Sequence, residues 1–215
     1  GQTPDYWDNA YFDGSYFHNG KATAVKGFCT DVWFDYAKRF IHKQKEADKP
    51  FLAYITTNAP HGPMHSPKKF SEPYRGQNAN VANFFGMIAN IDDNVGRLRA
   101  FLRDEGLADN TIFIFTTDNG TSSGSGVFNA GMRGKKGSEY DGGHRVPFFV
   151  HWPAGGLTAP RDVTAVTAHV DVVPTLLDLC RIQPPANIQF DGTSIRALIE
   201  GQAGVKTGIG PIEFW

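Results

Sequence analysis

The chain of 215 residues contains few cysteines and almost no net charge. Its 21 Lys and Arg residues are balanced by 22 Asp and Glu residues, so the formal charge is −1 with histidine neutral. This balance excludes a protein that binds nucleic acid or a membrane surface mainly through its overall charge. We therefore expect no nucleic-acid partner and no membrane partner.

Long apolar runs and closely spaced cysteines are also missing. No stretch approaches the roughly 20 apolar residues of a membrane span, and no segment has the pattern of a signal peptide. The two cysteines, Cys29 and Cys180, have no Cys or His partner at zinc-ligand spacing. We expect both to be buried free thiols, because cysteine often behaves as a small hydrophobic residue.

The residues that are present indicate a folded α/β protein with long loops. Hydrophobic residues make up 40% of the chain, and 24 Gly and 13 Pro predict much irregular structure. A hairpin with an Asn19-Gly20 turn is expected within residues 16–26. One helix is expected to begin after an N-cap at Thr30. A second is expected over 81–102, with its end near Gly106, and a third over 171–179. Strands are expected over 51–57, 110–117 and 145–152, the first of them buried on both faces.

The order of these elements predicts a layered, largely parallel sheet with helices on both faces. We expect a single partial domain over 1–215. Within it, residues 1–28 form a loop and hairpin lead-in, residues 29–200 form the α/β core portion, and residues 201–215 form a tail.

Polar, chemically capable residues follow the first two predicted strands. His61 lies in the segment 58–63 after the first strand, and Asp118-Asn119 follows the second. Lys135 and Lys136 lie in the glycine-rich loop 121–144 that leads into the third strand. In an open α/β sheet, ligands bind outside the carboxyl ends of the strands. The sequence therefore predicts a functional site there.

Each candidate residue has a functional and a structural interpretation. Asp118 and Asn119 offer hard oxygens that suit Ca²⁺ or Mg²⁺, or they form an Asx turn before Gly120. His61 is placed for acid-base chemistry or contact with an anion, or it is a hydrogen-bonded loop histidine. Lys136 has flexible glycine neighbours that let its ammonium approach an anion, or it belongs to an exposed basic loop.

Taken together, these segments resemble the sulfatase family of the alkaline-phosphatase-like superfamily. The resemblance covers about residues 28 to 200, and several ordered motifs are more specific than any one of them. The matching segments are Asn58-Ala59-Pro60-His61-Gly62-Pro63, Ile91-Asp92-Asp93-Asn94-Val95-Gly96, Thr117-Asp118-Asn119-Gly120, residues 134–147 from Gly134 to Pro147, residues 171–178, and Asp191-Gly192-Thr193-Ser194.

The resemblance implies a role for each matching residue. Asp118 and Asn119 are expected to be two ligands of a single Ca²⁺, sometimes Mg²⁺, that holds the sulfate ester. His61 is expected to contact the sulfate and assist the leaving oxygen, and Lys136 to contact a sulfate oxygen. Asp171 is expected to belong to the scaffold, as is Arg145.

The resemblance also implies residues that these segments do not include. Family members carry a Cys or Ser in a Cys/Ser-x-Pro/Ala-x-Arg motif, which is oxidised to a formylglycine nucleophile, before the segment that matches His61. Cys29 lacks the proline and the arginine, and the Ser71-x-Pro73-x-Arg75 match follows His61 instead of preceding it. We therefore expect the C-terminal portion of a sulfatase catalytic domain, inactive by itself.

The resemblance implies an arylsulfatase-like sulfuric ester hydrolase for aryl or carbohydrate sulfates, with a sulfated small molecule or glycan as partner. It also implies a periplasmic or secreted location. Two alternatives stay open. One is a phosphomonoesterase or phosphodiesterase of the same superfamily, and the other is a non-catalytic sugar-binding or interaction module.

Overall fold

The computed structural model describes residues 11–201, which form two compact units. Within that range, residues 11–109 and 114–149 make up the first unit, and residues 110–113 and 150–201 the second. The first ten residues of the expected lead-in and residues 202–215 of the expected tail lie outside the described residues. Whether both units belong to one catalytic domain stays a prediction.

The first unit begins with the predicted hairpin. Strands β1 (Ser15–His18) and β2 (Lys21–Ala24) pair antiparallel, with Ser15 opposite Ala24 and His18 opposite Lys21. Asn19 and Gly20 form the turn with φ of 51° and 78°. Two positive φ angles in sequence are typical of the type I′ turn, which is why the Asn-Gly pair predicted this hairpin.

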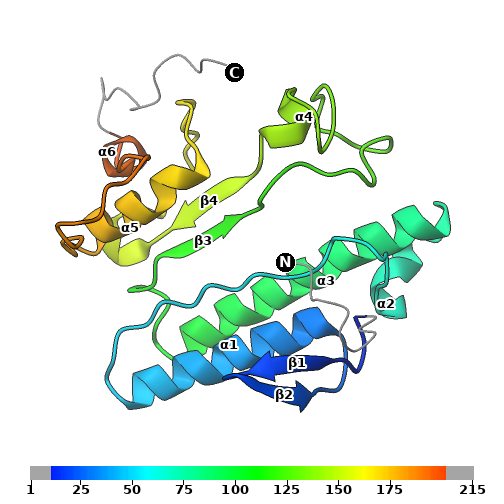
Figure 1. Ribbon diagram of the computed structural model, residues 1–215, viewed down its shortest axis with the longest axis horizontal. Helices are drawn as coiled ribbons and strands as arrows, with labels where there is room; N and C mark the ends of the chain where they lie inside the picture. The colour runs from blue at the N-terminus through cyan, green and yellow to red at the C-terminus, as the bar shows by residue number, and fades with distance from the viewer. Residues whose placement is uncertain (1–10, 202–215) are drawn as a thin grey trace. The chain divides into compact units, whose positions relative to one another are not determined.

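Two long helices, α1 (Cys29–Glu46) and α3 (Ala79–Asp104), lie side by side and carry the core of this unit (Figure 1). The predicted N-cap of α1 was wrong, because the helix begins at Cys29 with Phe28 as its N-cap residue. Thr30 is fully buried in the first turn, so its hydroxyl faces the core instead of capping the helix end.

Helix α3 has the length that its apolar periodicity predicted. Asn78 caps its start, because the side chain accepts a hydrogen bond of 3.0 Å from the backbone N–H of Val81. Gly106, with φ of +70°, follows its end as predicted. The buried face also contains Asn90 and Asn94, which an apolar stripe cannot reveal.

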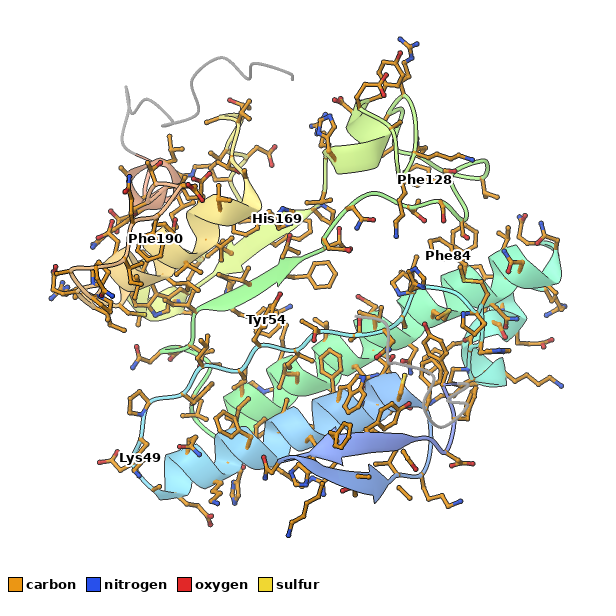
Figure 2. All side chains as sticks on the ribbon, viewed as in Figure 1. Lys49, Tyr54, Phe84, Phe128, His169 and Phe190 are labelled. Carbon is orange, nitrogen blue, oxygen red and sulfur yellow. The ribbon has the colours of Figure 1, made fainter. Side chains whose placement is uncertain are left out.

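The segment 51–57 is extended but is not the fully buried strand that was predicted. Exposure alternates along it, with Leu52 and Tyr54 76% and 86% exposed, whereas Phe51, Ala53 and Ile55 are partly buried. Tyr54 is labelled in Figure 2. Successive side chains of an extended segment point to opposite faces, so one face of this segment packs against the protein and the other reaches solvent. Among the described residues the segment also has no partner strand.

The other two predicted strands are confirmed at shorter length. Strands β3 (Phe113–Thr116) and β4 (Phe148–His151) are hydrogen-bonded neighbours in a two-stranded sheet. The rings of Phe115 and Phe149 are 6.4 Å apart. The larger parallel sheet stays a prediction, since the strand pairs of the described residues do not include it.

The second unit contains the predicted helix α5 (Val172–Leu179), which follows the 3-10 turn η3 (His169–Asp171). Buried Asp171 accepts hydrogen bonds of 2.9 Å from the backbone N–H groups of Ala168 and Thr193, so its contacts fit the scaffold role. Cys180 is exposed, so the expectation that both thiols are buried holds only for Cys29.

The remaining elements are single turns, and no helix within residues 11–201 is long and apolar enough to cross a membrane. The short elements are α2 (Lys68–Ser71), η1 (Glu72–Tyr74), α4 (Asp141–His144), η2 (Pro153–Gly155) and α6 (Arg196–Ile199).

Candidate active site

His61 lies on a tight loop that follows the extended segment 51–57. Its backbone N–H donates to the carbonyl of Asn58 at 2.9 Å, and its Nδ1 lies 2.9 Å from the carbonyl oxygen of Gly62. A carbonyl only accepts, so Nδ1 must carry the proton in this contact. Nε2 is then left to face solvent as an acceptor when the imidazole is neutral and as a donor when it is charged. The side chain of His61 is exposed, and its Nδ1 is engaged by its own loop.

Two aromatic residues that the sequence did not single out hold this loop. The Tyr11 hydroxyl donates to the backbone carbonyl of His61 at 2.5 Å. Trp33 of α1 donates from Nε1 to the side-chain oxygen of Asn58 at 3.3 Å. Neither residue lies in a family motif, so the sequence carried no signal for them beyond an aromatic-rich segment.

The side chains of Asp118 and Asn119 converge directly after β3. Asn119 Nδ2 lies 2.5 Å from Asp118 Oδ2. In this contact the amide nitrogen donates to the carboxylate, so a bound cation would require a half-turn of the amide to bring its oxygen beside the carboxylate. A carboxylate and an amide oxygen are ligand types that fit part of a Ca²⁺ or Mg²⁺ coordination shell.

The glycine-rich loop folds back onto the residues after Asn119. The N–H of Gly120 donates to the carbonyl of Gly143 at 2.9 Å, and the N–H of Lys136 donates to the carbonyl of Thr121 at 2.9 Å. The second bond places the backbone of Lys136 beside the segment that follows the Asp118-Asn119 pair. Asp118, Asn119 and Lys136 thus lie on backbone segments that this loop holds next to each other.

Glycines permit this arrangement at the positions that flank the two lysines. Gly134 and Gly137 have φ of 77° and 85°, in the left-handed region that residues with a Cβ rarely adopt. The side chain of Lys136 is exposed, and none of the described residues forms a hydrogen bond or ion pair with its ammonium group. That ammonium is available to an anion.

Side-chain contacts fix the rest of this loop, although it has little regular structure. Asn129 donates from Nδ2 to the carbonyls of Met132 at 2.7 Å and Gly134 at 2.8 Å. The guanidinium of Arg133 lies over the ring of Tyr140, 3.7 Å from its centroid. A long loop with such internal contacts is more typical of a binding loop than of a linker.

His61 is not joined to the other candidates by any hydrogen bond or ion pair of its side chain within residues 11–201. The same residues contain no group of three or more His, Cys, Asp or Glu side chains that could hold a metal ion. Asp118 and Asn119 can therefore supply only part of a shell that for Ca²⁺ needs about six to eight oxygens. The predicted roles of His61, Lys136, Asp118 and Asn119 stay predictions.

An exposed imidazole, an available ammonium group and a carboxylate beside a side-chain amide are groups that enzymes acting on anionic esters use. The model of the Sulfatase family matches residues 2–182. The uncharacterized sulfatase YdeN of Escherichia coli strain K12 is 30% identical over 190 residues, covering 86% of this chain and 34% of that protein. The N-acetylgalactosamine-6-sulfatase of Canis lupus familiaris is 30% identical over 178 residues, covering 80% of this chain and 33% of that protein.

A solved structure is also similar to this chain. The crystal structure of Ps i-CgsB in complex with k-i-k-neocarrahexaose matches with a TM-score of 0.79 at 30% identity, covering 86% of this chain and 41% of that chain. The chain belongs to the sulfatase family, whose members are sulfuric ester hydrolases with an α/β fold. It spans about a third of the length of the curated relatives named here.

Proposed function

We propose that the protein of which this chain is part hydrolyses sulfate monoesters, aryl or carbohydrate. The observation that carries the proposal is the fold-back of the glycine-rich loop, which ties Lys136 to Thr121 beside the Asp118-Asn119 pair. A sulfuryl group in transfer spreads negative charge over its oxygens. A cationic donor next to a cation-binding pair of oxygens is suited to hold that charge.

Two residues of this chain would act on the ester itself. Lys136 would contact a sulfate oxygen through its ammonium group, which the described residues leave without a partner. His61 would present Nε2 to the ester, because Nδ1 is engaged by the carbonyl of Gly62 at 2.9 Å. In the charged imidazolium form, Nε2 would donate its proton to the leaving oxygen and leave a neutral imidazole protonated at Nδ1, which lowers the cost of breaking the ester bond.

Asp118 and Asn119 would hold one Ca²⁺, or Mg²⁺, together with ligands from outside this chain. When bound, the cation would neutralise charge on the sulfate, and a formylglycine elsewhere in the protein would supply the nucleophile. Cys29 is an unsuitable precursor, since its side chain is buried in the core with 1% exposure.

We also propose that the chain is an incomplete catalytic unit. The segment 51–57 leaves its backbone donors and acceptors without ladder partners in the described part of the chain, and its apolar residues Leu52 and Tyr54 are exposed. An extended apolar segment with free edges pairs readily with further strands. The matched region covers 34% and 33% of the two relatives named above, so about two thirds of each relative lies outside the match and could supply such strands.

A sulfated glycan is the substrate class that we favour. The supporting observation is that the relatives and structures similar to this chain include an N-acetylgalactosamine-6-sulfatase and a protein solved in complex with k-i-k-neocarrahexaose. The exposed aromatic side chain of Phe128, on the glycine-rich loop, offers a face on which a sugar ring could stack (Figure 2).

Turnover of sulfate esters by the natural protein that contains this chain tests the proposal. A chromogenic aryl sulfate and a sulfated monosaccharide would be compared for the wild type, His61→Ala and Asp118→Ala. We expect both variants to lose most of their activity on each ester, and undiminished turnover in both would overturn the site. An aryl phosphate of the same leaving group serves as control, since preferred hydrolysis of the phosphate would favour the phosphatase alternative.

The isolated chain of 215 residues gives a second test. We expect no turnover and only weak binding of Ca²⁺, because two ligands provide a small part of the shell. A sub-micromolar affinity measured by titration calorimetry would contradict the proposal that the site needs further ligands.

A further inference from the structure

Tyr11 is held in an unusual backbone conformation close to the His61 loop. Its φ of 70° lies in the left-handed region, which is costly for a residue with a large side chain. The backbone around it is fixed, because the N–H of Cys29 donates to the carbonyl of Tyr11 at 2.8 Å and Phe12 forms a β-bridge with Phe28. Such a conformation persists where surrounding contacts determine it, and it points to a role for the side chain that it directs.

The side chain of Tyr11 reaches across to the loop of His61. Its hydroxyl donates to the His61 carbonyl at 2.5 Å, and the carbonyl of Asn58 lies 3.3 Å from the same hydroxyl. The ring stacks on Phe28 at 5.8 Å between centroids and meets the ring of His65 at 6.4 Å. The side chain is therefore fixed along its whole length, with 7% of the residue exposed.

This contact constrains the orientation of the imidazole. The carbonyl that accepts from Tyr11 belongs to the peptide group between His61 and Gly62, and peptide groups are planar. The imidazole is anchored to the next carbonyl, that of Gly62, through Nδ1. Rotation of the first peptide group would move the second and release the ring, so the hydrogen bond from Tyr11 limits the direction in which Nε2 points.

Burial keeps Tyr11 in the donor form. Desolvation raises the pKa of Tyr11 well above its usual range, with smaller contributions from nearby Cys29 and Tyr16. The hydroxyl is therefore protonated at neutral pH and available as a donor.

We propose that Tyr11 is a positioning residue for His61: its hydrogen bond to the His61 carbonyl holds the loop so that Nε2 is directed at the leaving oxygen. The proposal rests on the function proposed above, since it assigns to His61 a contact with the ester. Tyr11 would not touch the substrate, and its effect would pass through the peptide group between residues 61 and 62.

The test compares Tyr11→Phe with Tyr16→Phe in the natural protein that contains this chain. Both substitutions remove one hydroxyl from a buried tyrosine and keep the ring. The Tyr16 hydroxyl is hydrogen-bonded to the Cys29 side chain, and within residues 11–201 it makes no hydrogen bond to the His61 loop. For Tyr11→Phe we expect kcat on a sulfate ester to fall about tenfold while KM changes less than about twofold, because a positioning effect acts in the transition state. We expect Tyr16→Phe to match the wild type in both constants.

Hydrogen exchange followed by mass spectrometry gives a readout that needs no turnover. We expect peptides covering residues 57–66 to exchange about tenfold faster in Tyr11→Phe and at the wild-type rate in Tyr16→Phe. Equal kcat in the two variants would overturn the proposal, and so would a fall in kcat with unchanged exchange in this loop. If the wild type hydrolyses no sulfate ester, the proposed function fails, whereas the exchange comparison still decides whether Tyr11 holds the loop.

Discussion

Asp31 on α1 accepts a hydrogen bond of 2.7 Å from the side-chain amide of Asn94 on α3. The same carboxylate oxygen accepts from Asn90 at 2.9 Å and from Arg97 at 3.2 Å. Asn90 and Asn94 are 0% and 1% exposed, so this polar cluster lies within an otherwise apolar helix interface. The contacts fix the register of α1 against α3, because a shift of either helix would leave buried amides without an acceptor.

Removal of this acceptor should destabilise the chain. We expect Asp31→Ala to lower the free energy of unfolding by about 2 kcal/mol or more, since the buried amide of Asn90 loses its acceptor. Asp35→Ala is the matched control, because Asp35 lies one turn later on the same helix and makes a partly exposed ion pair with Lys38 at 2.8 Å. Such a pair contributes less than about 1 kcal/mol. Equal losses in urea unfolding would contradict the role of the cluster.

The close approach of the glycine-rich loop to Gly120 gives a second prediction. A Cβ at Gly120 would collide with the carbonyl oxygen of Gly142, next to the bond that Gly120 donates to Gly143. We expect Gly120→Ala to displace the loop and to cost about 1–3 kcal/mol. At Gly126 a Cβ would meet no atom within 4 Å, so Gly126→Ala should change the unfolding midpoint little. Thermal unfolding of the two variants makes the comparison, and similar midpoints would refute it.

Substitution of each of the two adjacent lysines distinguishes a specific contact with the sulfate ester from a general effect of positive charge on the loop. Lys136→Ala should reduce kcat/KM for a sulfate ester about a hundredfold in the natural protein, as loss of one donor to a transition-state oxygen commonly does. Lys135→Ala removes the same charge one residue away and should stay within about threefold of wild type. Equal losses would mean that the loop attracts the anion through its net charge alone.

The two thiols should differ in reactivity. Cys29 is buried, and burial raises the pKa of its thiol to about 11, whereas Cys180 is exposed. Only the thiolate reacts with disulfide reagents, so Cys29 should be inert in the folded chain. We expect one thiol to react quickly under native conditions and two in denaturant. The fast reaction should disappear in Cys180→Ser and persist in Cys29→Ser.

The stability of the folded chain should decrease at alkaline pH, because burial raises the pKa of groups in its core. The pKa of Cys29 rises from an ordinary value of 9.0 to about 11 on folding, and that of Tyr16 from 10.0 to about 12, in both cases mainly through burial. The folded state therefore keeps protons that the unfolded state loses. The contribution of Cys29 is complete below pH 9.0 and is lost as the pH rises to about 11. Urea unfolding at about pH 8 and about pH 10 should show a smaller decrease in Cys29→Ala than in wild type.

Much of the local structure could be predicted because its causes are local. The Asn19-Gly20 pair adopts the positive φ angles of its turn, the periodicity of residues 81–102 gives α3, and Gly106 follows its end. The N-cap of α1 was predicted wrongly, because burial of the Thr30 side chain outweighed its capping preference. The buried strand expected at 51–57 was wrong, since strand pairing and burial both depend on neighbours that are distant in sequence.

Some residues of the candidate site could likewise be predicted from the sequence, and others could not. Motif order alone predicted His61, Asp118, Asn119 and Lys136, because each follows a strand or lies in a glycine-rich loop. It gave no sign of Tyr11, which lies 50 residues from His61 and reaches it through a single hydroxyl. A hydrogen bond between residues so far apart in the sequence cannot be predicted from helix or strand periodicity.

The sequence by itself determined the family of this protein, the types of chemical group at its site and the periods of its main helices, since these depend on residue identity and local spacing. Only the tertiary structure decided that Asp31 joins α1 to α3, that Lys136 is tied to Thr121, and that Tyr11 holds the His61 loop. The physical reason is that each of these hydrogen bonds joins two polar groups that only the packing of the chain brings close together. No local sequence pattern identifies the partner of either group.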